Sequence, residues 1–271
     1  MITKKFTGIF STGKPIVAMI HIQALPGTPG NNLNTQQIVD QACQEAEVLI
    51  RCGVQGIMME NMHDTPYLNR SVGPEINSNM TRVACEIRSL TNLPLGIQIL
   101  AGANQEALAV AQAADLQFIR SEGFVFGHVA DEGLMESDAG SLLRYRKKIG
   151  AEDIQIFTDV KKKHSSHALT ADISLEETIE AAEFFRSDGA IITGTATGKP
   201  VEAAELSSAY EHAKTPILVG SGVSPEGLAD IIDHTDAFIV GSYFKKDGNW
   251  MNPPDPQRLQ ALLNAREQLV P

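Results

Sequence analysis

The stretch Ile154-Gln155-Ile156-Phe157-Thr158-Asp159-Val160-Lys161 shows most clearly how this chain is built. Its apolar residues predict a short buried strand, and charged residues stand where that strand ends. Similar runs occur along the chain, each followed by a helical pattern. The predicted strands are residues 16–21, 56–60, 94–100, 116–121, 154–160, 189–194, 216–220 and 237–241. Eight alternations of strand and helix predict a (β/α)8 TIM barrel, whose active site would lie at the carboxyl ends of the strands.

The length and the loops indicate a single domain. The chain has 271 residues, which matches one barrel of roughly 250 residues better than two ordinary domains. We expect one domain over residues 1–271, with residues 6–13 covering the bottom of the barrel. Long loops are predicted after the first and second strands, at residues 25–32 and 62–77, where they would act as lids. Helices are predicted at residues 35–51, 78–90, 104–114, 137–149, 174–186, 201–212, 225–233 and 255–268.

Charge and cysteine content narrow the possible partners and compartment. The formal charge of −11 argues against nucleic acid or an anionic membrane as a default partner, since both favour a basic surface. Cys43, Cys52 and Cys85 match no zinc spacing and are expected to be buried thiols in a reducing compartment. No apolar run approaches the roughly 20 residues of a membrane span. We therefore expect a cytoplasmic protein, with peripheral membrane association left as an alternative.

The fifth predicted strand offers a candidate acid/base pair. Strand alternation puts Phe157, Asp159 and Lys161 on one face and the neighbouring apolar residues on the other. If the apolar face packs on helices, Asp159 and Lys161 point into the barrel mouth together. A carboxylate and an ammonium so placed can transfer protons and tune each other's pKa. The alternative is a structural ion pair at the rim of the barrel.

The same sorting brings further polar side chains to the mouth. His21, Gln98, Arg120 and Glu122 are predicted to face inward from the first, third and fourth strands. Glu60 and Asn61 point to opposite faces, so only one of the two should line the mouth unless the strand ends at Glu60. Arg120 could anchor a carboxylate or phosphate. Its alternative role is a salt bridge to Glu122, Glu60 or Asp159.

Two glycine-rich turns follow the seventh and eighth strands. They are Gly220-Ser221-Gly222 and Gly241-Ser242. Barrels that bind phosphorylated substrates often hold the phosphate between these two loops, on backbone N–H groups that glycine allows to approach closely. The sequence therefore predicts a phosphate site, with ordinary tight turns as the alternative.

A basic stretch, residues 161–167, stands out in this acidic chain. It follows the fifth strand and could attract an anionic ligand, so Lys163 and His164 are predicted to bind substrate, whereas Lys162 is expected to be solvated. No cofactor is predicted, because the chain has no dinucleotide or P-loop motif. A divalent metal is left as an alternative, since acidic and histidine side chains could gather there. Its candidate ligands are Glu60, His63, Asp64 and Asp159.

Motifs spread over nearly the whole chain resemble the BtpA family. The stretches that carry the resemblance are His21 with Ala24-Leu25-Pro26-Gly27-Thr28-Pro29, Glu60-Asn61-Met62-His63-Asp64-Thr65-Pro66-Tyr67, Arg120, Asp131-Glu132-Gly133, Asp159-Val160-Lys161-Lys162-Lys163-His164 and Val219-Gly220-Ser221-Gly222-Val223. The resemblance implies a TIM barrel. It also implies two kinds of role, because a cyanobacterial member is associated with thylakoid membranes and photosystem I accumulation, whereas other members carry nucleosidase or phosphoribosylanthranilate isomerase labels.

The leading hypothesis is an enzyme that acts on a phosphorylated sugar or nucleotide-like molecule by acid/base chemistry. Asp159 and Lys161 would be catalytic, with His21 or Glu60 as the second proton-transfer group, and Asn61, Asp64, Gln98, Arg120, Glu122, Lys163 and His164 would bind substrate. The loops at Gly220, Ser221, Gly222, Gly241 and Ser242 would hold the phosphate. Phosphoribosylanthranilate isomerases have a Cys where this chain has His21, so that particular activity is not expected.

Three alternatives stay open from the sequence. Lys161 could be the nucleophile of a Schiff-base lyase. Glu60, Asp64 or Asp159 could serve as the acid of a nucleosidase. A non-enzymatic assembly factor would bind a protein partner at a membrane surface, and residues 244–251 would be its docking loop, unless that loop covers the barrel or joins the subunits of a homo-oligomer.

Overall fold

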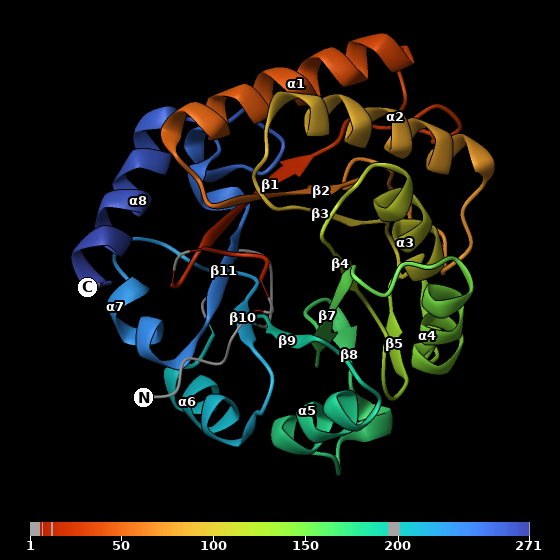
Figure 1. Cartoon of the computed structure of the whole chain (residues 1–271). Helices are drawn as coiled ribbons and strands as arrows, with labels where there is room; N and C mark the ends of the chain where they lie inside the picture. Colours follow the sequence, from red (N-terminus) through yellow and green to blue (C-terminus); the bar gives the residue numbers. More distant parts are fainter. Residues whose placement is uncertain (1–5, 7, 12, 195–200, 271) are drawn as a thin grey trace.

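The computed structural model describes residues 6, 8–11, 13–194 and 201–270. Over these residues eight parallel strands close into a barrel, and helices surround it (Figure 1). The strands follow one another around the barrel as β1 (Ile16–His21), β11 (Ala237–Val240), β10 (Ile217–Val219), β9 (Gly189–Ile192), β7 (Gln155–Val160), β4 (Phe118–Ser121), β3 (Leu95–Gln98) and β2 (Gly56–Glu60). The predicted (β/α)8 barrel is confirmed.

The helices lie close to their predicted positions. They are α1 (Thr35–Cys52), α2 (Pro74–Leu90), α3 (Asn104–Ala113), α4 (Ala139–Lys148), α5 (Leu175–Phe184), α6 (Ala203–His212), α7 (Leu228–Ile231) and α8 (Pro256–Leu269). Helix α1 begins with a capping box, in which Asn34 and Gln37 each accept a hydrogen bond from the other's backbone N–H. Helix α2 begins four residues before the predicted start, because Pro74 occupies the first turn, where a missing N–H costs nothing. The loop after β2 is shorter by that much.

Phenylalanine rings close the bottom of the barrel. Phe118 and Phe157 point inward, and Phe6 and Phe10 pack onto them from the N-terminal segment, with ring centroids 5.7 Å apart for Phe6–Phe157 and 6.2 Å for Phe10–Phe118. The room for Phe118 comes from Gly96 on the adjacent strand, where a Cβ would lie 2.0 Å from the ring. The expected cover at the bottom is present in the described part of residues 6–13.

A small second sheet over the mouth was not predicted. It consists of β5 (His128–Ala130), β6 (Gly133–Met135) and β8 (Ser165–Ser166), so it ties the loop after β4 to the loop after β7. The loop after β2 joins them: Asn69 Nδ2 donates to the Leu134 carbonyl at 2.9 Å, and Arg70 forms an ion pair with Asp138 at 2.9 Å. Three loops are therefore held together at the carboxyl end of the barrel.

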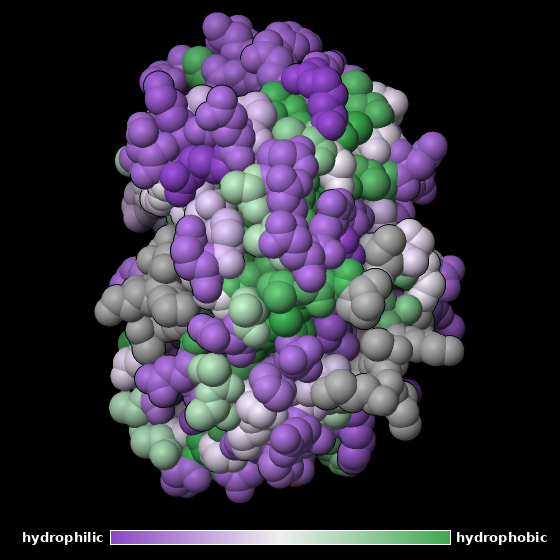
Figure 2. All heavy atoms as spheres, turned by 90° about the vertical axis from the view of Figure 1, so that its left-hand side faces the viewer, coloured by the Kyte–Doolittle hydropathy of each residue, from purple (hydrophilic) through white to green (hydrophobic). Residues whose placement is uncertain are grey.

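The face of the molecule in Figure 2 is mostly polar. Hydrophilic residues predominate there, with apolar residues gathered near its middle. Among the described residues, no helix combines the length and apolarity that crossing a membrane requires.

The three cysteine thiols differ in exposure. Cys43 and Cys52 are half-buried, but Cys85 is exposed, so the expectation of three buried thiols is wrong for Cys85. Position 85 falls on the outward face of α2, because its neighbours Val83, Ala84 and Ile87 take the buried face.

Candidate active site

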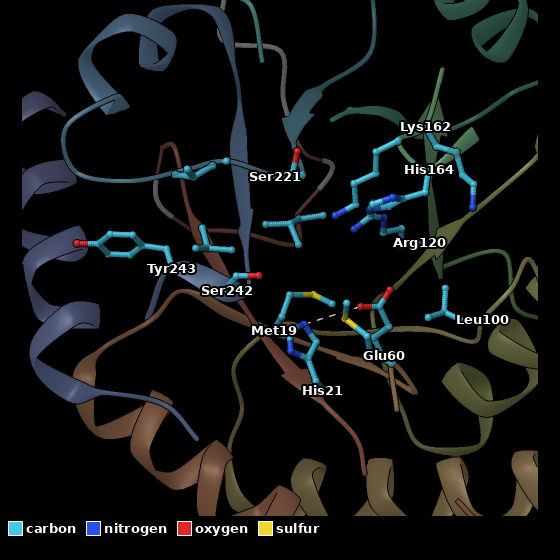
Figure 3. A pocket seen from close by; sticks show the side chains of 18 of the residues that line it. Met19, His21, Glu60, Leu100, Arg120, Lys162, His164, Ser221, Ser242 and Tyr243 are labelled. Atoms are coloured by element: carbon cyan, nitrogen blue, oxygen red, sulfur yellow. Dashed lines mark ion pairs between the residues drawn. The ribbon is translucent and has the colours of Figure 1, made fainter. Parts of the chain in front are cut away.

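A cavity of about 630 Å³ lies at the carboxyl ends of the strands. In Figure 3, Arg120, Lys162 and His164 lie on one side of it, Ser221, Ser242 and Tyr243 on the other, and His21 with Glu60 along a third edge. Most of the predicted site residues line this cavity: His21, Glu60, Arg120, Glu122, Lys163, His164, Gly220, Ser221, Gly222, Gly241 and Ser242. The remaining predicted residues, Asn61, Asp64, Gln98, Asp159 and Lys161, do not line it.

His21 and Glu60 lie next to each other at the edge of the cavity. They end the neighbouring strands β1 and β2, where they stand directly opposite each other, and His21 Nε2 lies 3.9 Å from Glu60 Oε2. Burial, with the nearby Lys245 charge, lowers the pKa of His21 to about 3, so the imidazole is neutral at physiological pH. Burial raises the pKa of Glu60, because a charged carboxylate is poorly solvated there. A neutral base thus faces a carboxyl group that holds its proton more tightly than usual.

Arg120 pairs with Asp159 rather than standing free. Its Nε and Nη2 donate to the two carboxylate oxygens of Asp159 at 2.8 and 2.7 Å. Although burial opposes its charge, the ion pair raises the pKa of Arg120 above its usual range. The predicted salt-bridge alternative for Arg120 is therefore present, and Asp159 positions the guanidinium at the wall of the cavity.

The predicted pairing of Asp159 with Lys161 is wrong. Lys161 has a left-handed backbone, with φ 46°, so the strand alternation that placed it beside Asp159 ends at Val160. Its Nζ donates to the carbonyl oxygen of Ile173. Lys161 and Asp159 do both contact a separate space of about 20 Å³, which is too small for a metabolite. The mouth therefore contains no Asp159–Lys161 acid/base pair.

The Lys162 side chain is only 11% exposed and forms an ion pair, so the expectation that it is solvated is also wrong. Its Nζ lies 3.0 Å from Glu122 Oε2, and the Glu122 Oε1 atom accepts a hydrogen bond from Gln98 at 3.0 Å. Although burial opposes its charge, Glu122 raises the pKa of Lys162. Gln98 supports this pair from behind the cavity wall. Sequence reasoning missed the pair because it judged the lysine run by composition and not by which lysine turns inward.

Lys163 differs from both of its lysine neighbours. Its side chain lines the cavity, and its backbone N–H donates to Thr193 Oγ1 at 3.1 Å. Burial and the adjacent Arg120 charge lower the pKa of its ammonium group. Among the described residues, no carboxylate forms an ion pair with Lys163. Its amine therefore lies at the mouth without an ion-pair partner among the described residues.

The two glycine-serine turns supply free backbone donors. Among the described residues, the N–H groups of Ser221, Gly222 and Gly241 donate to no protein acceptor. Ser221 Oγ accepts a hydrogen bond from the Gly194 N–H at 2.7 Å, which leaves the hydroxyl hydrogen able to donate. Gly241 must be small, because a Cβ there would lie 3.0 Å from His21 Nε2. This packing puts the turn after β11 directly against the imidazole.

Asn61 and Asp64 hold loops rather than facing the cavity. Asp64 accepts hydrogen bonds from the Leu25 N–H at 2.7 Å and from Asn61 Nδ2 at 2.8 Å. Asn61 Oδ1 accepts a third, from the Leu100 N–H at 2.8 Å. The loops after β1, β2 and β3 are joined through these two side chains. Neither residue lines the cavity, and their predicted role in substrate binding stays a prediction.

The segment after β11 carries residues that sequence reasoning did not place in the site. Trp250 sets its backbone carbonyl oxygen 3.0 Å from His21 Nδ1, and its ring packs on His63 with centroids 4.8 Å apart. Lys245, only 1% exposed, pairs with Glu45 of α1. The sequence signal that could have placed this segment in the site is its tryptophan, the only one in the sequence, which follows the last predicted strand. The segment covers one side of the barrel, which was the alternative to a docking loop.

The metal alternative finds no geometric support in the described part of the chain. There, no three His, Cys, Asp or Glu side chains gather as a metal ion requires. The four candidate ligands separate, because Asp159 turns to Arg120 and Asp64 to the loop backbone.

A model of the BtpA family matches residues 12–268. The chain belongs to the BtpA family. It is 43% identical to an uncharacterized mitochondrial protein of Caenorhabditis elegans, with 94% of each chain covered. It is 33% identical to the photosystem I biogenesis protein BtpA of Synechocystis, with 94% of this chain and 89% of that protein covered.

Solved structures share the fold of this BtpA family member at low sequence identity. Thiamine phosphate pyrophosphorylase from Pyrococcus furiosus aligns with a TM-score of 0.60 at 12% identity, over 95% of this chain and 97% of that one. Phosphoribosyl anthranilate isomerase from Thermus thermophilus gives 0.57 at 11%, over 93% and 99%. Orotidine 5'-phosphate decarboxylase from Pyrococcus horikoshii gives 0.56 at 13%, over 93% and 99%. These likenesses establish the TIM barrel.

Proposed function

We propose that this protein is an enzyme that acts on a phosphorylated sugar or nucleotide-like molecule by acid/base chemistry. The observation that carries the proposal is that one cavity is lined by the His21–Glu60 pair and by both glycine-serine turns, whose Ser221, Gly222 and Gly241 N–H groups have no acceptor in the described part of the chain. Free N–H groups near a serine hydroxyl suit a phosphate dianion. The proton-transfer pair beside them suits the reacting part of the same molecule.

The names of the structural neighbours support the phosphate part of this proposal. Each of the three barrels is named for a molecule that carries phosphate. In TIM barrels the loops after the last two strands often hold that group. In this chain those loops are the turns at Ser221 and Ser242.

The proton-transfer roles follow from the directions in which burial shifts the two pKa values. The Nδ1 atom of a neutral His21 donates its hydrogen to the Trp250 carbonyl, which leaves the Nε2 lone pair as a base. Glu60, whose pKa is raised, is the matching acid. Isomerisation of a phosphoribosyl compound needs one such acid and one such base. Cleavage of an N-glycosidic bond needs the acid on the leaving base, and Glu60 fits that role as well.

Arg120 would stabilise negative charge that develops during the reaction. Asp159 holds the guanidinium through Nε and Nη2. A fixed cation needs no reorganisation when charge appears, which is how preorganised sites lower a barrier. Asp159 is therefore proposed as a positioning residue.

The docking-loop alternative is not favoured by residues 244–251. Phe244 and Lys245 are buried, and Trp250 contacts His21 and His63 instead of projecting from the surface. The Synechocystis relative is named for photosystem I biogenesis. A cytoplasmic location and a homo-oligomeric state stay predictions from the sequence.

A thermal-shift screen of ribose phosphates and nucleoside monophosphates, with and without Mg²⁺, tests the proposal. A ligand that binds the folded state raises the melting temperature by mass action. We expect a rise in the wild type that Ser221→Glu abolishes, because the new carboxylate would repel the phosphate. Ser89→Glu, at an exposed position of α2, is the matched control and should keep the rise. No response of the folded wild type to any phosphate compound would overturn the proposal.

A further inference from the structure

The charged side chains of the mouth are unevenly paired. Arg120 forms an ion pair with Asp159, and Lys162 forms an ion pair with Glu122. Lys163 and Glu60 belong to neither pair, and the same holds for Asp131, Glu132 and Arg258, which also line the cavity. In the described part of the chain Lys163 and Glu60 form no ion pair with each other, and Glu60 has only the neutral His21 within 4 Å as a basic neighbour. Among the described residues, the Lys163 amine therefore forms no ion pair with a carboxylate, and the Glu60 carboxyl group forms none with a lysine or arginine.

This arrangement separates Lys163 from the two lysines before it. Lys161 donates a hydrogen bond to the carbonyl oxygen of Ile173, and Lys162 forms an ion pair with Glu122. Lys163 alone of the three lines the cavity with its amine unpaired. Burial and the neighbouring Arg120 charge lower the pKa of the Lys163 amine, although nearby carboxylates oppose the shift, so more of it is neutral at a given pH than of an exposed lysine. A neutral amine has the lone pair that a nucleophile requires.

We propose that Lys163 is the nucleophile of this site and forms an imine with the aldehyde or ketone group of a phosphorylated substrate. This inference rests on the function proposed above and deepens it by naming a carbonyl compound as the substrate class. It also moves the Schiff-base role from Lys161, which the sequence had suggested, to the lysine two residues further on.

The step balances with groups already in the cavity. The Nζ lone pair forms a bond to the carbonyl carbon, and the carbonyl oxygen takes a proton from Glu60, which gives a carbinolamine once Nζ has lost a proton. Either His21 Nε2 or the Glu60 carboxylate can accept that proton. Protonation of the hydroxyl group by Glu60 or His21 then lets it leave as water, and the C=N bond forms. No oxidant, reductant or metal takes part.

Borohydride trapping tests the proposal directly. The folded protein is incubated at pH 7 with glyceraldehyde 3-phosphate and sodium borohydride, and the modified lysine is located by peptide mass spectrometry. We expect a reduced adduct on Lys163 at least tenfold above any other lysine. Lys163→Arg should abolish it and keep the positive charge. Lys161→Arg is the matched control and should keep it.

Two comparisons separate this proposal from the phosphate site. Unphosphorylated glyceraldehyde labelling Lys163 as strongly as the phosphorylated form, and equally in Ser221→Glu, would support the imine and contradict the phosphate site. A phosphate-dependent thermal shift without a Lys163 adduct would do the reverse and overturn the imine. Adducts spread evenly over many lysines would overturn it as well, because they would show ordinary surface reactivity.

The pH dependence of trapping gives an independent readout. An amine with a lowered pKa reaches its maximal rate at lower pH than the exposed lysines. The Lys163 adduct should therefore form with an inflection below 10.5, the ordinary value for lysine. An inflection at or above that value would contradict the proposed nucleophile.

Discussion

The Nδ1 atom of His21 lies 3.0 Å from the backbone carbonyl oxygen of Trp250, 229 residues away in the sequence. The contact joins the first barrel strand to the segment after the last one. A carbonyl oxygen only accepts hydrogen bonds, so the ring hydrogen must sit on Nδ1. The other nitrogen, Nε2, is left without a hydrogen and faces Glu60. One backbone atom thus fixes the tautomer of the candidate base.

The depressed pKa of His21 makes stability depend on pH. The folded state keeps this ring neutral down to about pH 3, whereas an unfolded chain protonates it near 6.5. Between these values the unfolded state binds more protons, so the free energy of unfolding falls as the pH falls. The His21→Gln variant lacks this dependence. Urea unfolding should show the wild-type advantage over the variant shrinking by about 2 kcal/mol between pH 7.5 and 5.0. Parallel pH profiles of the two proteins would contradict this.

The Arg120–Asp159 pair should matter more for folding than an exposed pair of the same kind. Asp159→Ala leaves the Arg120 charge buried without a partner, which typically costs about 3–5 kcal/mol. The control is Glu86→Ala, which breaks the exposed Arg82–Glu86 pair and should cost less than about 0.5 kcal/mol. Urea unfolding at pH 7 gives both values. Similar losses in the two variants would refute the burial argument.

The absence of a side chain at Gly241 should matter more for ligand binding than for folding. In Gly241→Ala the new methyl group would press on the His21 ring, whose nearest atoms lie 3.0 and 3.1 Å from the Cβ position. Overpacking of this kind costs about 1–3 kcal/mol. We expect a folded protein with lowered melting temperature and at least tenfold weaker trapping or ligand binding.

Gly140→Ala provides the comparison for that variant. Its Cβ would meet only the flexible end of Arg144, at 3.4 Å, within α4. Alanine is a better helix former than glycine by roughly 0.5–1 kcal/mol, so stability should be equal or higher and binding unchanged. Equal loss of binding in both variants would show that the tight packing at Gly241 has no special role.

Asp64 should act on the loops and not on the ligand. Asp64→Ala removes the acceptor for the Leu25 N–H and for Asn61. Leaving a buried donor unpaired costs about 1–3 kcal/mol. We expect a lower melting temperature and faster proteolysis between residues 22 and 33, with the affinity for phosphate changed less than threefold in the folded protein. A large loss of affinity without faster proteolysis would restore the substrate-binding role first predicted for Asp64.

Much of the fold could be predicted from the sequence, because buried parallel strands are apolar runs and their ends are polar. Every predicted run contains a barrel strand. The start of α2 was missed since Gly73-Pro74 reads equally as a loop, and the sheet of β5, β6 and β8 was missed since its strands are only two or three residues long. Such short pairings depend on contacts between distant loops, which periodicity does not reveal.

The sequence predicted which residues lie at the site, but it did not predict which side chains pair with one another. Strand ends located His21, Glu60 and Arg120 at the cavity, but the partner of each side chain depends on backbone angles. Because the backbone of Lys161 is left-handed, strand alternation does not predict the directions of the side chains of Lys161, Lys162 and Lys163. The buried pair of Lys245 with Glu45 spans 200 residues and leaves no local pattern. Ion pairs between distant segments form only when the barrel closes, so the pattern of one segment alone does not predict them.

Trp250 is the only tryptophan in the sequence. Its indole lies against the imidazoles of His21 and His63 at the edge of the mouth. The tryptophan fluorescence of the whole chain therefore comes from one ring beside the candidate base. Occupancy of the cavity, or movement of the segment after β11, would alter that emission without any added dye. The protein thus carries its own optical probe, suited to stopped-flow measurements of ligand arrival.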